Sequence, residues 1–171
     1  TVNALAVDPA APRTVFAGTF GSGVWRSTDG GASWQRVLFG GRDLPDRHAP
    51  VNALAIDPTD PRIVYAATDA GFNAGVWRSV DGGGTWTLST AGLPGNFRLN
   101  ALALDPKTPT TVYAGAVSAG VFKSTDGGAS WTPPAAGPMR NARVFALAID
   151  PSSPAVVWAG IPNGLMRSAD G

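Results

Sequence analysis

The chain carries an internal repeat, and this repeat constrains the fold more than any other feature. One landmark is an apolar stretch, Asn-Ala-Leu-Ala in three of its four copies, that ends in Asp-Pro. A second landmark, Ser-x-Asp-Gly, follows each time, and three of its four copies continue to a Trp. The aspartates of the first landmark are 49, 48 and 45 residues apart (8 to 57, 57 to 105, 105 to 150). The chain is therefore built from four copies of one structural unit.

The repeat length matches that of a four-stranded propeller blade. In the first unit we predict strands over 2–7, 14–18 and 23–27, and a fourth strand that begins at 33. The 22 Gly and 15 Pro and the absence of Glu favour strands and turns over helices. Since the first strand is apolar on both faces, we expect it to be innermost and buried on both sides.

The predicted fold is therefore all-β: a β-propeller of four-stranded antiparallel blades, forming one domain over 1–171. The blade repeats are 1–50, 51–98, 99–143 and 144–171. The last repeat stops before its fourth strand, so about 3¾ blades are present. Because an open blade exposes strand edges, we expect this chain to be part of a larger propeller. A four-blade ring that another chain completes is the alternative.

The element Ser-x-Asp-x-Gly-x-Ser/Thr-Trp resembles the Asp-box, or bacterial neuraminidase repeat, of sialidase-like propellers. The resemblance covers essentially the whole chain, with three complete boxes and one cut box. It implies a structural turn between the third and fourth strands, on the face away from the active site. The aspartate can accept hydrogen bonds from turn amides, and the Trp can pack over the hairpin. The residues of this structural set are Asp29, Asp81, Asp126, Asp170, Trp34, Trp86 and Trp131.

Composition excludes several classes of site. The net charge of +1 argues against a nucleic-acid partner. Cysteine is absent and His48 is the one histidine, so thiolate and multi-histidine metal sites are excluded, and we expect no metal and no cofactor. Since no apolar run is long enough to span a bilayer, we predict no transmembrane segment.

The residues outside the repeat gather in the connections that precede the first strand and follow the second strand of each unit. In propellers of the family these connections share one face, and that face carries the active sites. Arginines next to aromatic and amide side chains suit the binding of carboxylates or sugars. Solvated loop charges are the alternative interpretation. The predicted ligand- or partner-binding residues are Arg42, Arg47, His48, Arg98, Arg140, Arg143, Asp69 and Phe97.

The sequence lacks a complete catalytic set. Sialidases of the superfamily use a Tyr nucleophile with a Glu partner, but this chain has no Glu, and Tyr65 and Tyr113 stand at a repeated packing position. The segment 65–71 resembles a segment of xyloglucan-cleaving propellers in which an Asp is catalytic, with Ala67 replacing an Arg. Asp69 is thus the one catalytic candidate. Glycoside hydrolysis needs a second carboxylate, which this sequence does not identify.

The sequence therefore favours a non-catalytic propeller that binds a protein or a glycan through its Arg-bearing loop face. Related propellers act as assembly factors for photosynthetic complexes or as sorting receptors, so membership of a larger assembly is a second expectation. The resemblance implies an extracytoplasmic location: secreted, periplasmic or cell-surface. The alternative is a sialidase-like or xyloglucanase-like glycoside hydrolase whose active site lies partly in further blades.

Overall fold

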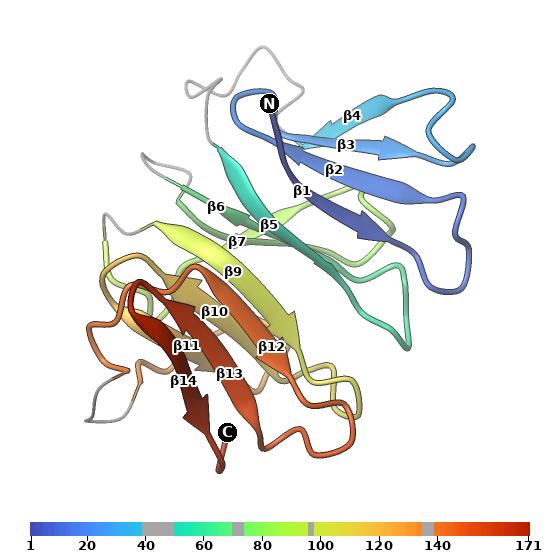
Figure 1. Ribbon diagram of the computed structural model, residues 1–171. Coiled ribbons are helices and arrows are strands. Elements are labelled where there is room, and N and C mark those ends of the chain that lie inside the picture. The colour runs from blue at the N-terminus through green and yellow to red at the C-terminus, as the bar shows by residue number, and fades with distance from the viewer. Residues whose placement is uncertain (39–49, 70–73, 96–97, 135–138) are drawn as a thin grey trace.

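The computed structural model describes residues 1–38, 50–69, 74–95, 98–134 and 139–171. Within these ranges all regular secondary structure is β, in four separate antiparallel sheets. In Figure 1 the sheets follow one another in chain order, from blue to red, and the first strand of each lies against the first strand of the next. This arrangement of consecutive blades is that of a β-propeller, as predicted.

Two sheets have four strands. The first consists of β1 (Val2–Val7), β2 (Val15–Thr19), β3 (Val24–Ser27) and β4 (Gln35–Leu38). The second consists of β5 (Val51–Ile56), β6 (Val64–Thr68), β7 (Gly75–Ser79) and β8 (Thr87–Ser89). The predicted strands of the first unit are thus correct within one or two residues.

The other two sheets have three strands each. The third consists of β9 (Leu99–Leu104), β10 (Val112–Ala116) and β11 (Gly120–Ser124), and the fourth of β12 (Ala146–Ile149), β13 (Val157–Ile161) and β14 (Gly164–Ser168).

The third sheet, as far as the structure describes it, has three strands. Where its fourth strand was expected, a single bridge joins Lys123 to Thr132. Pro133 and Pro134 follow directly. Because proline has no N–H to donate, this segment cannot extend the ladder.

Apolar side chains fill the space between successive sheets. Residues of β2, β3 and β4 pack against β5 and β6, with Phe16, Val24 and Val51 almost fully buried. A second cluster lies between the next two sheets, around Tyr65, Leu99 and Phe122. Alternate residues of β6 belong to the two clusters, because side chains of a strand point alternately to its two faces.

The prediction of a first strand buried on both sides is wrong for β1. Leu5 is 65% exposed and Val7 is 53% exposed. Their counterparts in β5, Leu54 and Ile56, pack against the core of the preceding sheet. Among the described residues, β1 packs against β2 and β5, and no sheet packs on its other side.

Candidate functional site

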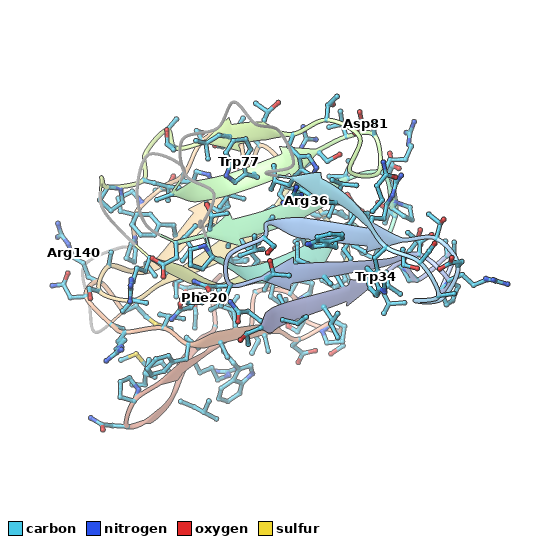
Figure 2. The ribbon with its side chains drawn as sticks, turned by 90° about the horizontal axis from the view of Figure 1, so that it is seen from above. Phe20, Trp34, Arg36, Trp77, Asp81 and Arg140 are labelled. Atoms are coloured by element: carbon cyan, nitrogen blue, oxygen red, sulfur yellow. The ribbon has the colours of Figure 1, made fainter. Side chains whose placement is uncertain are left out.

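The sheets have two different ends. We call one end the "turn end", because it carries the Asp-Pro and Ser-x-Asp-Gly turns. We call the opposite end the "loop end". It carries the connections between the second and third strands of each sheet (β2–β3, β6–β7, β10–β11 and β13–β14) and the segments that lead into β5, β9 and β12. Figure 2 shows Arg140 and Phe20 at one end of the molecule and Trp34 and Asp81 at the other. The arginine-bearing loops and the repeated turns therefore lie on opposite sides, as expected.

The Ser-x-Asp-Gly turns use their acidic side chains for local structure. In the second turn the Asp81 carboxylate accepts hydrogen bonds from the Ser79 hydroxyl (2.8 Å) and from the Thr85 amide (2.8 Å). The Thr85 hydroxyl donates to the other carboxylate oxygen. These hydrogen bonds, led by those from Thr85, lower the pKa of Asp81 from 3.8 to about 2. The first and third turns have the same hydrogen bonds around Asp29 and Asp126, with the same direction of pKa shift.

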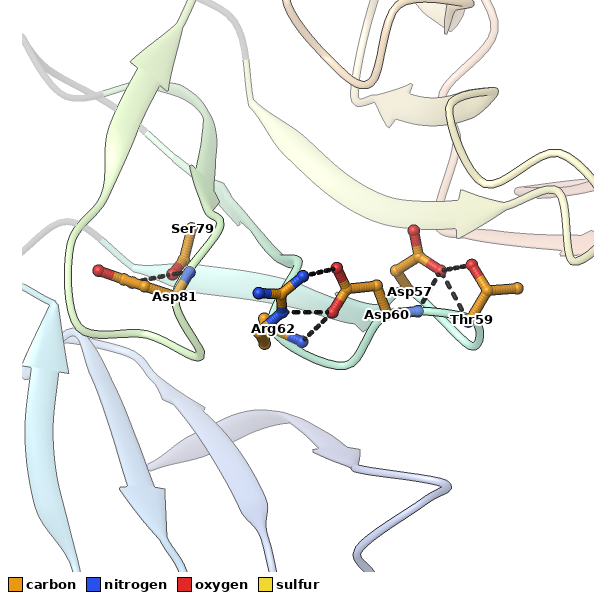
Figure 3. A network of polar contacts seen from close by, with 6 residues as sticks. All are labelled: Asp57, Thr59, Asp60, Arg62, Ser79 and Asp81. Atoms are coloured by element: carbon orange, nitrogen blue, oxygen red, sulfur yellow. Dashed lines mark hydrogen bonds and ion pairs between the residues drawn. The ribbon is translucent and has the colours of Figure 1, made fainter.

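The Asp-Pro turns use their aspartates in the same way. Oδ1 of Asp57 accepts hydrogen bonds from the amides of Thr59 (2.8 Å) and Asp60 (3.1 Å), as Figure 3 shows. The other three copies repeat this pair of amide contacts. Seven of the eight aspartates in the two kinds of turn thus accept hydrogen bonds from backbone amides, and the eighth, Asp170, accepts one from the Ser168 hydroxyl.

The described part of the loop end contains one acidic residue, Asp69, and it is buried. Asp69 follows β6, is 7% exposed, and forms an isolated bridge with Arg98 at the start of the third sheet. Nε of Arg98 lies 3.0 Å from Oδ1 of Asp69. The N–H does not meet hydrogen-bond geometry, so this oxygen is buried with an ion pair but without a hydrogen bond. The Arg98 side chain remains 64% exposed and extends the site to the surface.

Arg143 occupies the position in the fourth unit that Arg98 occupies in the third. Each directly precedes a fully buried apolar residue, which is Leu99 after Arg98 and Val144 after Arg143. The counterpart of Asp69 in the third unit is Val117, which cannot pair with a cation. The guanidinium of Arg143 instead lies over the Phe145 ring, with Cζ 5.1 Å from the centroid. Arg143 is exposed and forms no ion pair with a described residue.

Arg140 is exposed in the same loop region, and it too forms no ion pair with a described residue. Figure 2 shows its side chain projecting into solvent. The described loop end therefore carries three arginines and one aspartate, and the aspartate is paired. The excess charge of the described loop end is positive, and two of its guanidinium groups form no ion pair with a described residue.

Four predicted binding residues, Arg42, Arg47, His48 and Phe97, lie outside the described residues. In the described ranges no group of three or more metal-ligating side chains comes together. The same ranges contain no helix long and apolar enough to cross a bilayer. The sequence did not predict the contact between Asp69 and Arg98, which joins two repeats. Alignment of the repeats gives only part of this signal, because Asp69 aligns with Val117 of the third unit, whereas Arg98 aligns with Arg143 of the fourth.

No family model matches the chain, and no curated protein matches it in sequence. Solved structures match its fold. An ancestral GH74 enzyme superposes with a TM-score of 0.78 at 22% identity, over 99% of this chain and 23% of the enzyme. The GH74 enzyme of Niastella koreensis gives 0.77 at 24% identity, over 99% of this chain and 28% of the enzyme. An auxiliary nutrient binding protein from Bacteroides thetaiotaomicron gives 0.66 at 14% identity, over 97% of this chain and 37% of that protein.

These likenesses establish the β-propeller fold. The chain spans about a quarter of the length of the two GH74 enzymes.

Proposed function

We propose that this chain is an Asp-box propeller module that binds anionic groups of a glycan or protein partner through its loop end. The observation that carries the proposal is the charge balance of that end. Its one described carboxylate is buried against Arg98, whereas Arg140 and Arg143 are exposed and form no ion pair with a described residue. A guanidinium binds a carboxylate with two parallel hydrogen bonds, which gives both affinity and orientation.

Aromatic side chains add to this surface. Phe20 is 63% exposed in the β2–β3 connection, and Phe145 lies beneath the Arg143 guanidinium. A sugar ring presents apolar C–H groups to an aromatic face and hydroxyls to neighbouring polar groups, so rings next to arginines suit an acidic sugar. Arg42, Arg47, His48 and Phe97 belong to the proposed surface by their sequence position.

The proposal locates the module outside the cytoplasm, as a secreted, periplasmic or cell-surface protein. An auxiliary nutrient binding protein shares the fold, so this architecture is compatible with a binding role. A binding propeller of this kind can also serve as one part of a larger assembly.

Asp69 supports a second candidate function, glycoside hydrolysis. It is a buried carboxylate at the end of the sheets where propeller enzymes act, and two GH74 enzymes share the fold. Hydrolysis needs two carboxyl groups about 5 to 9.5 Å apart. The described loop end supplies one, so this candidate requires a second from outside the described residues.

Two assays separate the candidates. A screen on immobilised oligosaccharides should show retention on uronic-acid-containing glycans or on acidic peptides, and weak retention on neutral glucans. Turnover of xyloglucan or of a sialoside that is lost in Asp69→Asn would favour the hydrolase. Retention that ignores ligand charge would contradict the binding proposal.

A further inference from the structure

A cavity of about 490 Å³ lies between the second and third sheets. One wall is formed by β8, the edge strand of the second sheet, and the other by the Ser-x-Asp-Gly turn of the third. Cavities that hold small molecules measure about 300 to 1,000 Å³, so this one has the size of a ligand site. The described loop-end residues that carry the proposed function do not line it.

Strand alternation directs side chains of β7 and β8 towards this cavity. Arg78 pairs with Thr87 across the two strands, so both side chains lie on the same face of the sheet. Ser89, two residues further along β8, shares that face. Its hydroxyl donates to the carbonyl of Ala129 (3.3 Å) and accepts from the indole N–H of Trp131 (3.2 Å). These two hydrogen bonds fasten the walls of the cavity to each other.

Arg78 differs from the arginine at its position in the first unit. There, Nη1 of Arg26 donates to the carbonyl of Gly82, in the turn of the next sheet, at 2.6 Å. The corresponding carbonyl for Arg78 is that of Gly127, and the Tyr65 hydroxyl donates to it at 3.1 Å. The turn contact that holds the first arginine is therefore made by a different side chain in the second unit.

The guanidinium of Arg78 keeps part of its hydrogen-bonding capacity. It lies beside the Tyr65 hydroxyl, but its Nε is buried without a hydrogen-bond partner among the described residues. Arg78 also forms no ion pair with any of them. Since a guanidinium has five N–H donors and a permanent charge, an anionic acceptor in the cavity is the partner that fits it.

The cavity combines this one cation with hydroxyl groups and apolar surface. Among the described residues that line it, Arg78 is the only charged one. The carboxylates of Asp81 and Asp126, in the adjoining turns, accept hydrogen bonds from hydroxyls and amides of their own turns. The lining also includes Thr87, Ser89, Thr90, Val80 and Ala91. Such a lining suits a ligand with a carboxylate, hydroxyl groups and C–H surface.

The backbone amides of the third turn do not add an anion site to the cavity. The N–H of Gly127 donates to the carbonyl of Thr110, and that of Gly128 donates to the Ser124 hydroxyl, both at 2.8 Å. A phosphate is usually held by several free amides or cations. One guanidinium instead matches the single charge of a carboxylate.

We propose that this cavity binds a sugar acid, as a second site independent of the loop end. The ligand carboxylate pairs with the guanidinium N–H groups of Arg78, and the ligand hydroxyls hydrogen-bond with Thr87 and its neighbours on β8. The C–H groups of the ligand face Val80, which is 52% exposed. Val80 stands where the neighbouring turns have Thr28 and Thr125, so this apolar contact is particular to the second unit.

Isothermal titration calorimetry with D-glucuronate, and with D-glucose as its neutral counterpart, tests the proposal. We expect saturable binding of glucuronate that weakens with added salt, and much weaker binding of glucose. Arg78→Gln should raise the dissociation constant for glucuronate at least about tenfold, because the charge-assisted hydrogen bonds are lost. Thr87→Phe should act in the same direction, since the larger side chain fills the cavity opposite Arg78.

Gln35→Phe is the matched control for Thr87→Phe. Gln35 pairs with Arg26 on the first sheet as Thr87 pairs with Arg78 on the second, so this variant should bind glucuronate like the wild type. Circular dichroism checks that each variant folds. Thr87 is exposed and phenylalanine is favoured in strands, so Thr87→Phe tests the site even where Arg78→Gln disturbs the packing of the sheets.

The loop-end variant Arg140→Ala/Arg143→Ala separates the two sites, because it should leave glucuronate binding unchanged. A loss of binding in this variant alone would place the ligand at the loop end and overturn the second site, while the proposed function stands. Absence of saturable glucuronate binding, equal affinity for glucose, or an affinity that Arg78→Gln and Thr87→Phe leave unchanged overturns the proposal as well.

Discussion

Nη1 of Arg26 donates a hydrogen bond of 2.6 Å to the backbone carbonyl of Gly82, which belongs to the turn of the next sheet. The two residues are 56 positions apart in the chain, yet each stands at a repeated position of its own unit. The turn glycine and the strand arginine thus act together to set how one blade packs on the next.

Removal of this contact should destabilise the chain. We expect Arg26→Ala to lower the free energy of unfolding by about 1–2 kcal/mol, because it removes a charge-assisted hydrogen bond and leaves a carbonyl unpaired. Urea denaturation followed by tryptophan fluorescence measures the loss. Arg13→Ala, at an exposed turn-end arginine, is the control and should change stability by less than about 0.5 kcal/mol.

Gly18 should tolerate no side chain. A Cβ at this position would lie 2.7 Å from Cγ1 of Val51, so Gly18→Ala must displace the next sheet. We expect a loss of about 1–3 kcal/mol in the same denaturation experiment. Gly95→Ala serves as the control, since a Cβ there meets nothing within 4 Å. Equal stability of the two variants would show that Val51 moves aside without cost.

Stability should fall in acid because of the turn aspartates. The pKa of Asp81 is lowered to about 2 in the folded chain, against 3.8 for an unperturbed carboxyl. As the pH falls below about 4, the unfolded chain therefore binds protons before the folded chain does, and stability is lost down to about pH 2. Urea midpoints measured between pH 7 and pH 2 should show this fall.

Thr85→Val identifies the source of that pH dependence. It removes the hydroxyl that donates to Asp81, so the fall in stability between pH 4 and pH 2 should become smaller. Thr85→Ser keeps the hydroxyl, as Ser33 and Ser130 do in the neighbouring turns, and should retain the wild-type fall. An identical pH profile for both variants would remove this hydroxyl from the explanation.

The Asp69–Arg98 pair should show strong coupling in a double-mutant cycle. Arg98→Ala leaves a buried carboxylate uncompensated, so we expect it to cost about 1–2 kcal/mol of stability. Asp69→Asn removes that charge and should recover most of the loss in the double variant. Additive effects of the two substitutions would mean that the ion pair contributes nothing to stability.

The sequence alone predicts most of the fold, because the repeat marks each turn with Asp, Gly and Pro at positions where local chemistry decides the backbone. Asp57 and Asp81 show this, since their hydrogen bonds lie within four residues of each. Prediction failed where stability depends on neighbouring strands. β1 shows this, because burial of its apolar side chains requires a second sheet rather than the strand alone. In the third sheet as described, a single bridge at Thr132 stands in place of a fourth strand, because Pro133 and Pro134 follow it.

The site was predictable only in part for the same reason. The loop residues stand out because they leave the repeat, so Arg98, Arg140 and Arg143 could be named from the sequence. The burial of Asp69 and its pairing with Arg98 depend on how the second and third sheets meet, which no local pattern encodes.

The most direct test of loop-end binding is isothermal titration calorimetry with tetragalacturonate and, separately, with an acidic peptide. We expect saturable binding of at least one of these probes that weakens with added salt, and a loss of at least about tenfold in affinity in Arg140→Ala/Arg143→Ala. Arg13→Ala, at the turn end, should bind like the wild type. Binding of a probe that the double variant leaves unchanged, or no binding of either probe, would contradict the proposed function.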